Sequence, residues 1–241
     1  MRSRLLLVVA AALTAQARVG HAQSDLLSGG LTPGDYVRVS AGVTTPLNPQ
    51  GGFRDWKSGT GINVAWENWQ PGDNGVGRLG LSLGFAYSAL PLDQAKFLAD
   101  FTPLDGKQVA SASASNGKLF EVNTGLHIRI PAPLLVPTIR FGLGYIGWRP
   151  SKVSYTEVGG TTGTSKQTSR NGAEVSIGGG LERDFANRFG VFGEADYVYG
   201  FTSLGQSSAV PGSICAGGNG CDVLKNTSVA SIRGGLTVKI K

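Results

Sequence analysis

The chain has 241 residues, a formal net charge of +6 and 37 glycines, and 41% of its residues are hydrophobic. The length suits one domain, and the glycines follow no collagen-like period. Half of the net charge lies in the first 22 residues, which hold three arginines and no acidic residue, so the rest of the chain carries only +3. The charge is therefore poor evidence for a nucleic-acid partner, and we expect none.

The first 22 residues have the features of a secretory signal peptide. A basic start precedes an apolar run at 5–13, and Gly20 and Ala22 place small residues at the −3 and −1 positions of a cleavage site. About nine apolar residues are too few to cross a bilayer as a helix, and no later apolar run reaches the required ~18 residues. We therefore expect cleavage after residue 22 and a short periplasmic segment at 23–35.

Eight stretches with alternating apolar and polar residues then follow along the chain. This period of two places successive side chains on opposite faces of a β-sheet. The alternation is clearest in the third stretch, and Phe192 interrupts it in the seventh. The predicted strands are 36–43, 61–68, 78–88, 120–130, 138–145, 174–182, 189–201 and 230–240.

The gaps between these strands alternate between long and short. Long polar gaps lie at 45–59, 90–118, 149–171 and 202–226, and short ones lie at 71–75, 131–137 and 186–187. Antiparallel strands that cross a bilayer give this rhythm, because odd connections lie on one side and even connections on the other. We therefore predict an all-β fold, a closed antiparallel up-and-down eight-stranded transmembrane β-barrel over residues 36–241, with the long loops outside.

A soluble exported carrier with an apolar interior would have the same period. Further evidence is therefore needed to decide whether the apolar face of the strands points outward or inward. The polar face mixes small residues with charges of both signs, which a dry ligand cavity would not tolerate. Aromatic residues also gather near the strand ends, as in the two girdles of membrane barrels. These residues are Phe85, Tyr87, Phe120, Tyr145, Trp148, Tyr197, Tyr199 and Phe201 at the long-loop end, and Trp66, Trp69, Phe185 and Phe189 at the other.

With this strand pattern, the chain resembles the small eight-stranded outer-membrane barrels typified by the OmpA transmembrane domain and OmpX. The resemblance covers about residues 36–241. It implies the outer membrane of a Gram-negative bacterium, contact with outer-membrane lipid, and help from periplasmic chaperones and the barrel assembly machinery during export. Such barrels usually end in an aromatic residue, whereas residues 238–241 keep the alternation and lack one.

In such a barrel the polar face places charged residues in the lumen. Eight strands enclose a space that side chains can fill. Because unpaired buried charges are very costly, we expect opposite charges to pair and close the lumen; a narrow gated ion path is the alternative. The expected interior residues are Arg38, Glu67, Arg78, Glu121, His127, Arg129, Arg140, Glu174, Glu182, Glu194, Asp196, Arg233 and Lys239.

The two cysteines, Cys215 and Cys221, flank five residues in the last long gap. In an exported protein we expect them to form a disulfide that braces this loop, with two free thiols as the alternative. Two cysteines without a nearby histidine cannot complete a tetrahedral zinc site. We expect no metal and no cofactor.

Some barrels of this size are lipid-modifying enzymes with a histidine near the external rim. The only histidine after residue 22 is His127, and the predicted strand direction places it near the periplasmic end. We therefore expect a non-enzymatic role in envelope integrity or in surface interaction through the long loops. A narrow channel or transporter for small or apolar molecules is the alternative, and a lipid-modifying enzyme is the second.

Two segments of the long loops also have a period of two. Residues 107–115 and 152–157 could extend the strands beyond the membrane. An exposed sheet edge there could bind a strand of a surface partner. Long polar loops that only cover the external surface are the alternative.

Overall fold

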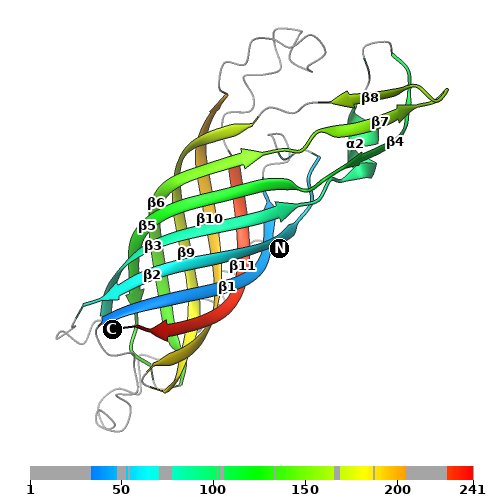
Figure 1. Cartoon of the computed structure of the whole chain (residues 1–241). Helices are drawn as coiled ribbons and strands as arrows, with labels where there is room; N and C mark the ends of the chain where they lie inside the picture. The colour runs from blue at the N-terminus through cyan, green and yellow to red at the C-terminus, as the bar shows by residue number, and fades with distance from the viewer. Residues whose placement is uncertain are drawn as a thin grey trace, which may run out of the picture.

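The computed structural model describes residues 34–47, 53, 55–70, 78–101, 103, 106–132, 134–165, 169–186, 188–204 and 227–240. They form a closed barrel of eight antiparallel strands, and a three-stranded sheet extends beyond one end of it (Figure 1). The order around the barrel is β1-β2-β3-β5-β6-β9-β10-β11, and β11 closes on β1. The predicted up-and-down barrel is confirmed. The expected signal peptide and the predicted disulfide between Cys215 and Cys221 lie outside the described residues.

The barrel strands contain between 11 and 17 residues, which is longer than the sequence pattern predicts. Hydrogen bonding between the strands continues past the apolar segments that the alternation marks. The strands are β1 (Gly34–Pro46), β2 (Gly59–Trp69), β3 (Arg78–Leu90), β5 (Gly117–Arg129), β6 (Val136–Arg149), β9 (Arg170–Ala186), β10 (Phe189–Leu204) and β11 (Thr227–Lys239).

The first and last strands pair along almost their whole length. The register runs from Tyr36 opposite Lys239 to Pro46 opposite Val229. Closure leaves no free sheet edge in the barrel wall, and only closed sheets and helices satisfy their backbone groups inside lipid. Because β1 begins and β11 ends at the end that carries the short turns, we call this the short-turn end and the opposite one the long-loop end.

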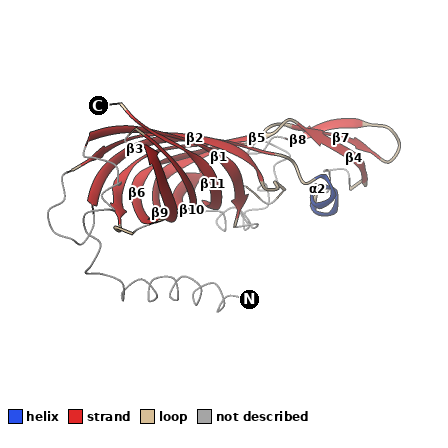
Figure 2. Ribbon diagram, turned by 90° about the horizontal axis from the view of Figure 1, so that it is seen from below, coloured by secondary structure: helices blue, strands red, loops and turns tan. Residues whose placement is uncertain are grey.

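Two of the long connections fold into ordered structure at the long-loop end. The connection after β3 contains helix α2 (Gln94–Asp100) and strand β4 (Val109–Ala114), and the connection after β6 contains β7 (Val153–Glu157) and β8 (Thr162–Ser165). Figure 2 shows this sheet beyond the barrel, with α2 beside it. We call these four elements the external module. The prediction that 107–115 and 152–157 extend the strands is confirmed.

Helix α2 is absent from the sequence-based prediction. It has seven residues, which is too short for a helical apolar period to stand out. Its N-cap is Asp93, whose carboxylate accepts a hydrogen bond from the backbone nitrogen of Lys96 at 3.2 Å. Among the described residues, no helix has the length and apolar character needed to cross a membrane.

Candidate functional site

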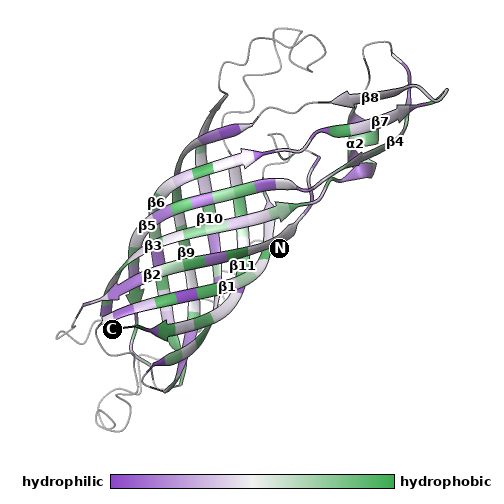
Figure 3. Cartoon of the chain, in the orientation of Figure 1, coloured by the Kyte–Doolittle hydropathy of each residue, from purple (hydrophilic) through white to green (hydrophobic). Residues whose placement is uncertain are grey.

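The outward face of the barrel is apolar. Apolar and polar positions alternate along the strands (Figure 3), and the apolar ones point away from the lumen, with Ile232 72% exposed and Leu143 64% exposed. So large an exposed apolar surface requires a hydrocarbon environment. The charged residues on this face of the described barrel strands are Asp35, Lys118, Arg149 and Arg183. The barrel therefore spans a membrane, and the soluble-carrier alternative is wrong.

Exposed aromatic residues lie near both ends of this apolar surface. Phe85, Tyr145 and Phe201 are among those at the long-loop end, and Trp66 and Phe185 are among those at the short-turn end. This arrangement is typical of the interfaces of transmembrane barrels. A closed barrel of eight strands with this exterior is an integral outer-membrane protein.

Two of the predicted girdle residues do not lie in the girdles. Trp148 and Trp69 point into the lumen and are only 1% and 2% exposed. Each shares the inward parity of its strand, as Ile146 does in β6 and Glu67 does in β2. The prediction is wrong for these two residues because the strands continue beyond the predicted boundaries.

Arg38 lies at the centre of an ion-pair network inside the barrel. Its Nε atom is 3.2 Å from Glu67 Oε1, its Nη2 atom is 3.1 Å from Glu194 Oε2, and it also pairs with Glu182. Its guanidinium group lies 3.6 Å from the centre of the Phe192 ring. Phe192 interrupts the sequence pattern because it points inward, where it covers a buried cation.

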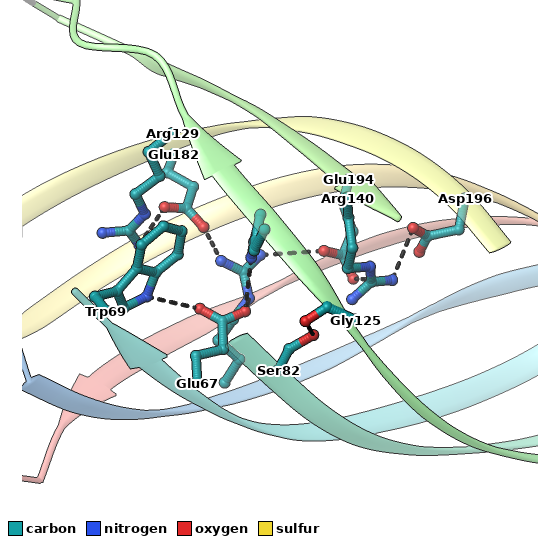
Figure 4. A network of polar contacts seen from close by, with 11 residues as sticks. Glu67, Trp69, Ser82, Gly125, Arg129, Arg140, Glu182, Glu194 and Asp196 are labelled. Atoms are coloured by element: carbon teal, nitrogen blue, oxygen red, sulfur yellow. Dashed lines mark hydrogen bonds and ion pairs between the residues drawn. The ribbon is translucent and has the colours of Figure 1, made fainter. Parts of the chain in front are cut away.

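The network continues toward the short-turn end (Figure 4). Glu67 accepts a hydrogen bond from Trp69 Nε1 at 3.1 Å, and its other oxygen lies 2.9 Å from His127 Nδ1. Arg129 pairs with Glu182 and lies 4.3 Å from the centre of the Trp69 ring. His127 is thus a buried partner of a carboxylate in the half of the barrel that faces away from the long loops.

A second group of ion pairs lies beside the first (Figure 4). Arg140 Nη2 is 2.7 Å from Asp196 Oδ1 and 3.8 Å from Glu194 Oε1. Arg233 Nη2 is 3.1 Å from Asp196 Oδ2. Because Glu194 also pairs with Arg38, it joins the two groups into one network. Each of these arginines is therefore neutralised by carboxylates of other strands.

Two interior carboxylates stand apart from these pairs. Glu121 and Glu174 are buried, and within the described residues neither makes a direct ion pair with an arginine. Glu174 interacts electrostatically with Glu121, and also with Arg233 and Arg140. Of the other residues expected inside, Arg78 and Lys239 lie at the short-turn rim, where both are partly exposed.

Apolar side chains close the lumen at the long-loop end. Trp148 is central: its ring centre lies 4.8 Å from that of Phe53 and 5.3 Å from that of Trp56. Gly117 makes room for the indole, since a Cβ atom at that position would overlap it. The buried cluster, which we call the apolar plug, consists of Phe53, Trp56, Leu90, Leu119, Ile146, Trp148, Val198 and Val229.

The apolar plug was not predicted from the sequence. Phe53 and Trp56 belong to the first long loop, which has no periodic pattern that would place them over the mouth of the barrel. Leu119, Ile146 and Val198, by contrast, occupy inward positions that elsewhere hold polar residues. The change from polar to apolar residues along the inward face is the sequence signal that could have revealed the apolar plug.

The opposite end of the lumen is closed by two aromatic residues. Tyr36 and Trp69 form a buried pair, and a Cβ atom at Gly80 would lie only 2.9 Å from the indole of Trp69. Within the described residues, the lumen thus has aromatic side chains at each end and ion pairs between them. Side chains fill a barrel of this strand number readily.

No family model and no curated protein matches the chain. Among solved structures, the chain is similar to a major outer membrane protein of Thermus thermophilus, with 19% identity, a TM-score of 0.49, and coverage of 86% of this chain and 99% of that one. Neisserial surface protein A has 12% identity, a TM-score of 0.46, and coverage of 86% and 97%. Ail of Yersinia pestis has 14% identity, a TM-score of 0.41, and coverage of 85% and 99%. At these identities the likeness concerns the fold and carries no function to this chain.

Proposed function

We propose that this protein is a non-enzymatic outer-membrane barrel that holds the external module outside the cell and acts in envelope integrity or surface interaction. The module has a core of its own. Phe97, Ala112 and Val153 are buried together, and the Phe101 ring lies 4.8 Å from Phe97 and 5.0 Å from Tyr155. A segment that merely covered the membrane surface would not need such a core.

The register of the barrel wall carries this proposal. Lys118 lies opposite Arg149 in the β5–β6 pair, and Ala114 lies opposite Val153 in the β4–β7 pair. Ala114 lies four residues before Lys118, and Val153 lies four residues after Arg149. The two strand pairs therefore share one register, although the pairing is interrupted between them. The module therefore continues two barrel strands in register, which supports a defined orientation of the module relative to the barrel.

The exposed parts of the module suit a protein or glycan partner. In the sheet order β4-β7-β8, β4 and β8 are the edge strands. Ser113, Ser154 and Thr164 are exposed on the sheet and offer hydroxyl groups that can donate and accept hydrogen bonds. An edge strand can also pair with a strand of another chain.

The test removes the module and keeps the barrel. Residues 91–116 and 150–169 would be replaced by short glycine-containing turns, and cells with either form would be compared for detergent resistance and for adhesion to surfaces. We expect the shortened protein to keep the heat-dependent gel mobility shift of a folded barrel while at least one of the two phenotypes is lost. Survival of both phenotypes after the deletion would contradict the proposal.

Passage of small apolar molecules is the second candidate function, and the apolar plug is the observation that favours it. Phe53 and Trp56 cover the mouth from a loop, and beneath them the lumen wall is apolar at Leu119 and Ile146. If this were an entrance, changing both loop residues to Ala would speed the uptake of an apolar dye by vesicles that contain the barrel. Uptake that is equal with and without the wild-type protein would dismiss this candidate.

A further inference from the structure

Two basic residues lie side by side on the outer wall of the barrel. Lys118 in β5 and Arg149 in β6 are directly opposed in the strand register, and both are exposed on the face that carries the apolar residues. Like charges in directly opposed positions destabilise a sheet. They are also the only charges that the described barrel strands present on this face at the long-loop end. An anion bound between the two side chains would remove this repulsion.

The pair lies just outside the aromatic girdle. Phe120 occupies the next outward position in β5, two residues from Lys118, and its ring centre is 6.1 Å from that of Tyr145. Two strand residues span about 7 Å. Because aromatic girdles lie at the level of the lipid headgroups, Lys118 and Arg149 reach the headgroup layer of the external leaflet.

The local packing holds Arg149 in place. The Phe120 ring packs against the neighbouring strand at Gly147, where a Cβ atom would overlap it. The guanidinium carbon of Arg149 is 5.4 Å from the centre of this ring, an arrangement that favours a cation–π interaction. The ring therefore steers the guanidinium group toward the outer wall.

Neither basic residue is neutralised within the described part of the chain, where no acidic group forms an ion pair with Lys118 or Arg149. On its other side, Lys118 lies opposite Ala89, which carries no charge. The arginines of the ion-pair network, by contrast, all have carboxylate partners.

We propose that Lys118 and Arg149 bind the phosphate group of a lipid headgroup in the external leaflet. A guanidinium fork and an ammonium group together match a phosphate, the first with two parallel hydrogen bonds and the second with a compact charge. The apolar chains of that lipid would lie along Val122 and Leu143, which are exposed below the girdle on the same two strands. The inference rests on the membrane position of the barrel and not on the role of the external module.

The test is a competition between two lipids for the detergent-purified barrel, read by native mass spectrometry. The probes are phosphatidic acid, which exposes a phosphate monoester, and zwitterionic phosphatidylcholine in equal amounts. Each basic residue near a membrane surface strengthens anionic lipid binding about fivefold. We expect the wild-type protein to prefer phosphatidic acid by about 25-fold and the K118Q/R149Q variant to lose this preference.

The matched control is K57Q/K96Q, which removes two lysines from the same end of the molecule but not from the outer wall. It should keep the wild-type preference, and the heat-dependent mobility shift would show that both variants are folded. A preference that persists in K118Q/R149Q, or that the control loses equally, would overturn the proposal. So would displacement of phosphatidic acid by millimolar inorganic phosphate, because the ligand would then be free phosphate. A variant without the module should still show the lipid preference, so this test fails or succeeds separately from the proposed function.

Discussion

At the scale of single residues, the lumen is governed by the cost of burying charge. Arg38 is 1% exposed and contacts three carboxylates and an aromatic ring. Replacing one partner in such a network leaves the others buried and unpaired, and this costs more than the pair itself contributes. Replacing a member of the ion-pair network should therefore lower the free energy of unfolding. Replacing a buried carboxylate that has no direct arginine partner should not.

The first prediction concerns Arg38. Arg38→Gln keeps most of the side-chain volume but leaves Glu67, Glu182 and Glu194 without their shared cation. We expect the free energy of unfolding to fall by about 3–5 kcal/mol. The measurement is guanidinium unfolding of the barrel in lipid vesicles, followed by tryptophan fluorescence and by the gel mobility shift. A loss below about 1 kcal/mol would show that the network is not what holds the interior together.

The second prediction concerns a surplus carboxylate. Glu174→Gln removes a buried carboxyl group that has no direct arginine partner among the described residues and lies near Glu121. We expect the same unfolding experiment to give unchanged stability or a gain of up to about 2 kcal/mol. A loss as large as that of Arg38→Gln would mean that Glu174 is an essential member of the network.

At the scale of elements, the external module differs from an ordinary loop because β4 and β7 continue the register of the barrel strands β5 and β6. Sequence alternation was enough to predict these extensions and the eight barrel strands, since a period of two needs only local information. It could not reveal α2, whose seven residues are stabilised by packing against β4. Nor could it place the helix beside the sheet, because that contact joins segments without a shared pattern.

The third prediction tests whether the module folds as a unit. Phe97→Ala truncates the largest fully buried side chain of its core, and a large-to-small change at a buried aromatic residue costs about 3–5 kcal/mol. In vesicles, trypsin should then cut the module at Lys107 and Lys152, while the barrel stays protected.

The control for this experiment is Gln94→Ala, on the exposed side of the same helix. It should leave the digestion pattern as in the wild-type protein. Equal cleavage of the wild-type protein, Gln94→Ala and Phe97→Ala would contradict a folded module.

At the scale of the whole molecule, the barrel is the inverse of a soluble protein. Its charged side chains lie in the lumen, and its apolar side chains lie on the outer wall and at the long-loop mouth. The inside and outside could be assigned from the sequence, and so could the residues that meet in the ion pairs, because parity fixes the face. The pairing itself could not, since it depends on the register and shear of eight strands. Trp148 was placed on the wrong face because the predicted strand ended at residue 145. Extending the alternation by three residues would have placed its side chain in the lumen.

The central claim is that side chains close the lumen of this membrane barrel. The most direct test is the electrical conductance of the purified wild-type protein in a planar bilayer, on samples whose mobility shift shows a folded barrel. The filled lumen predicts no discrete current steps above the lipid background at physiological salt. Reproducible open states of constant conductance would contradict the claim.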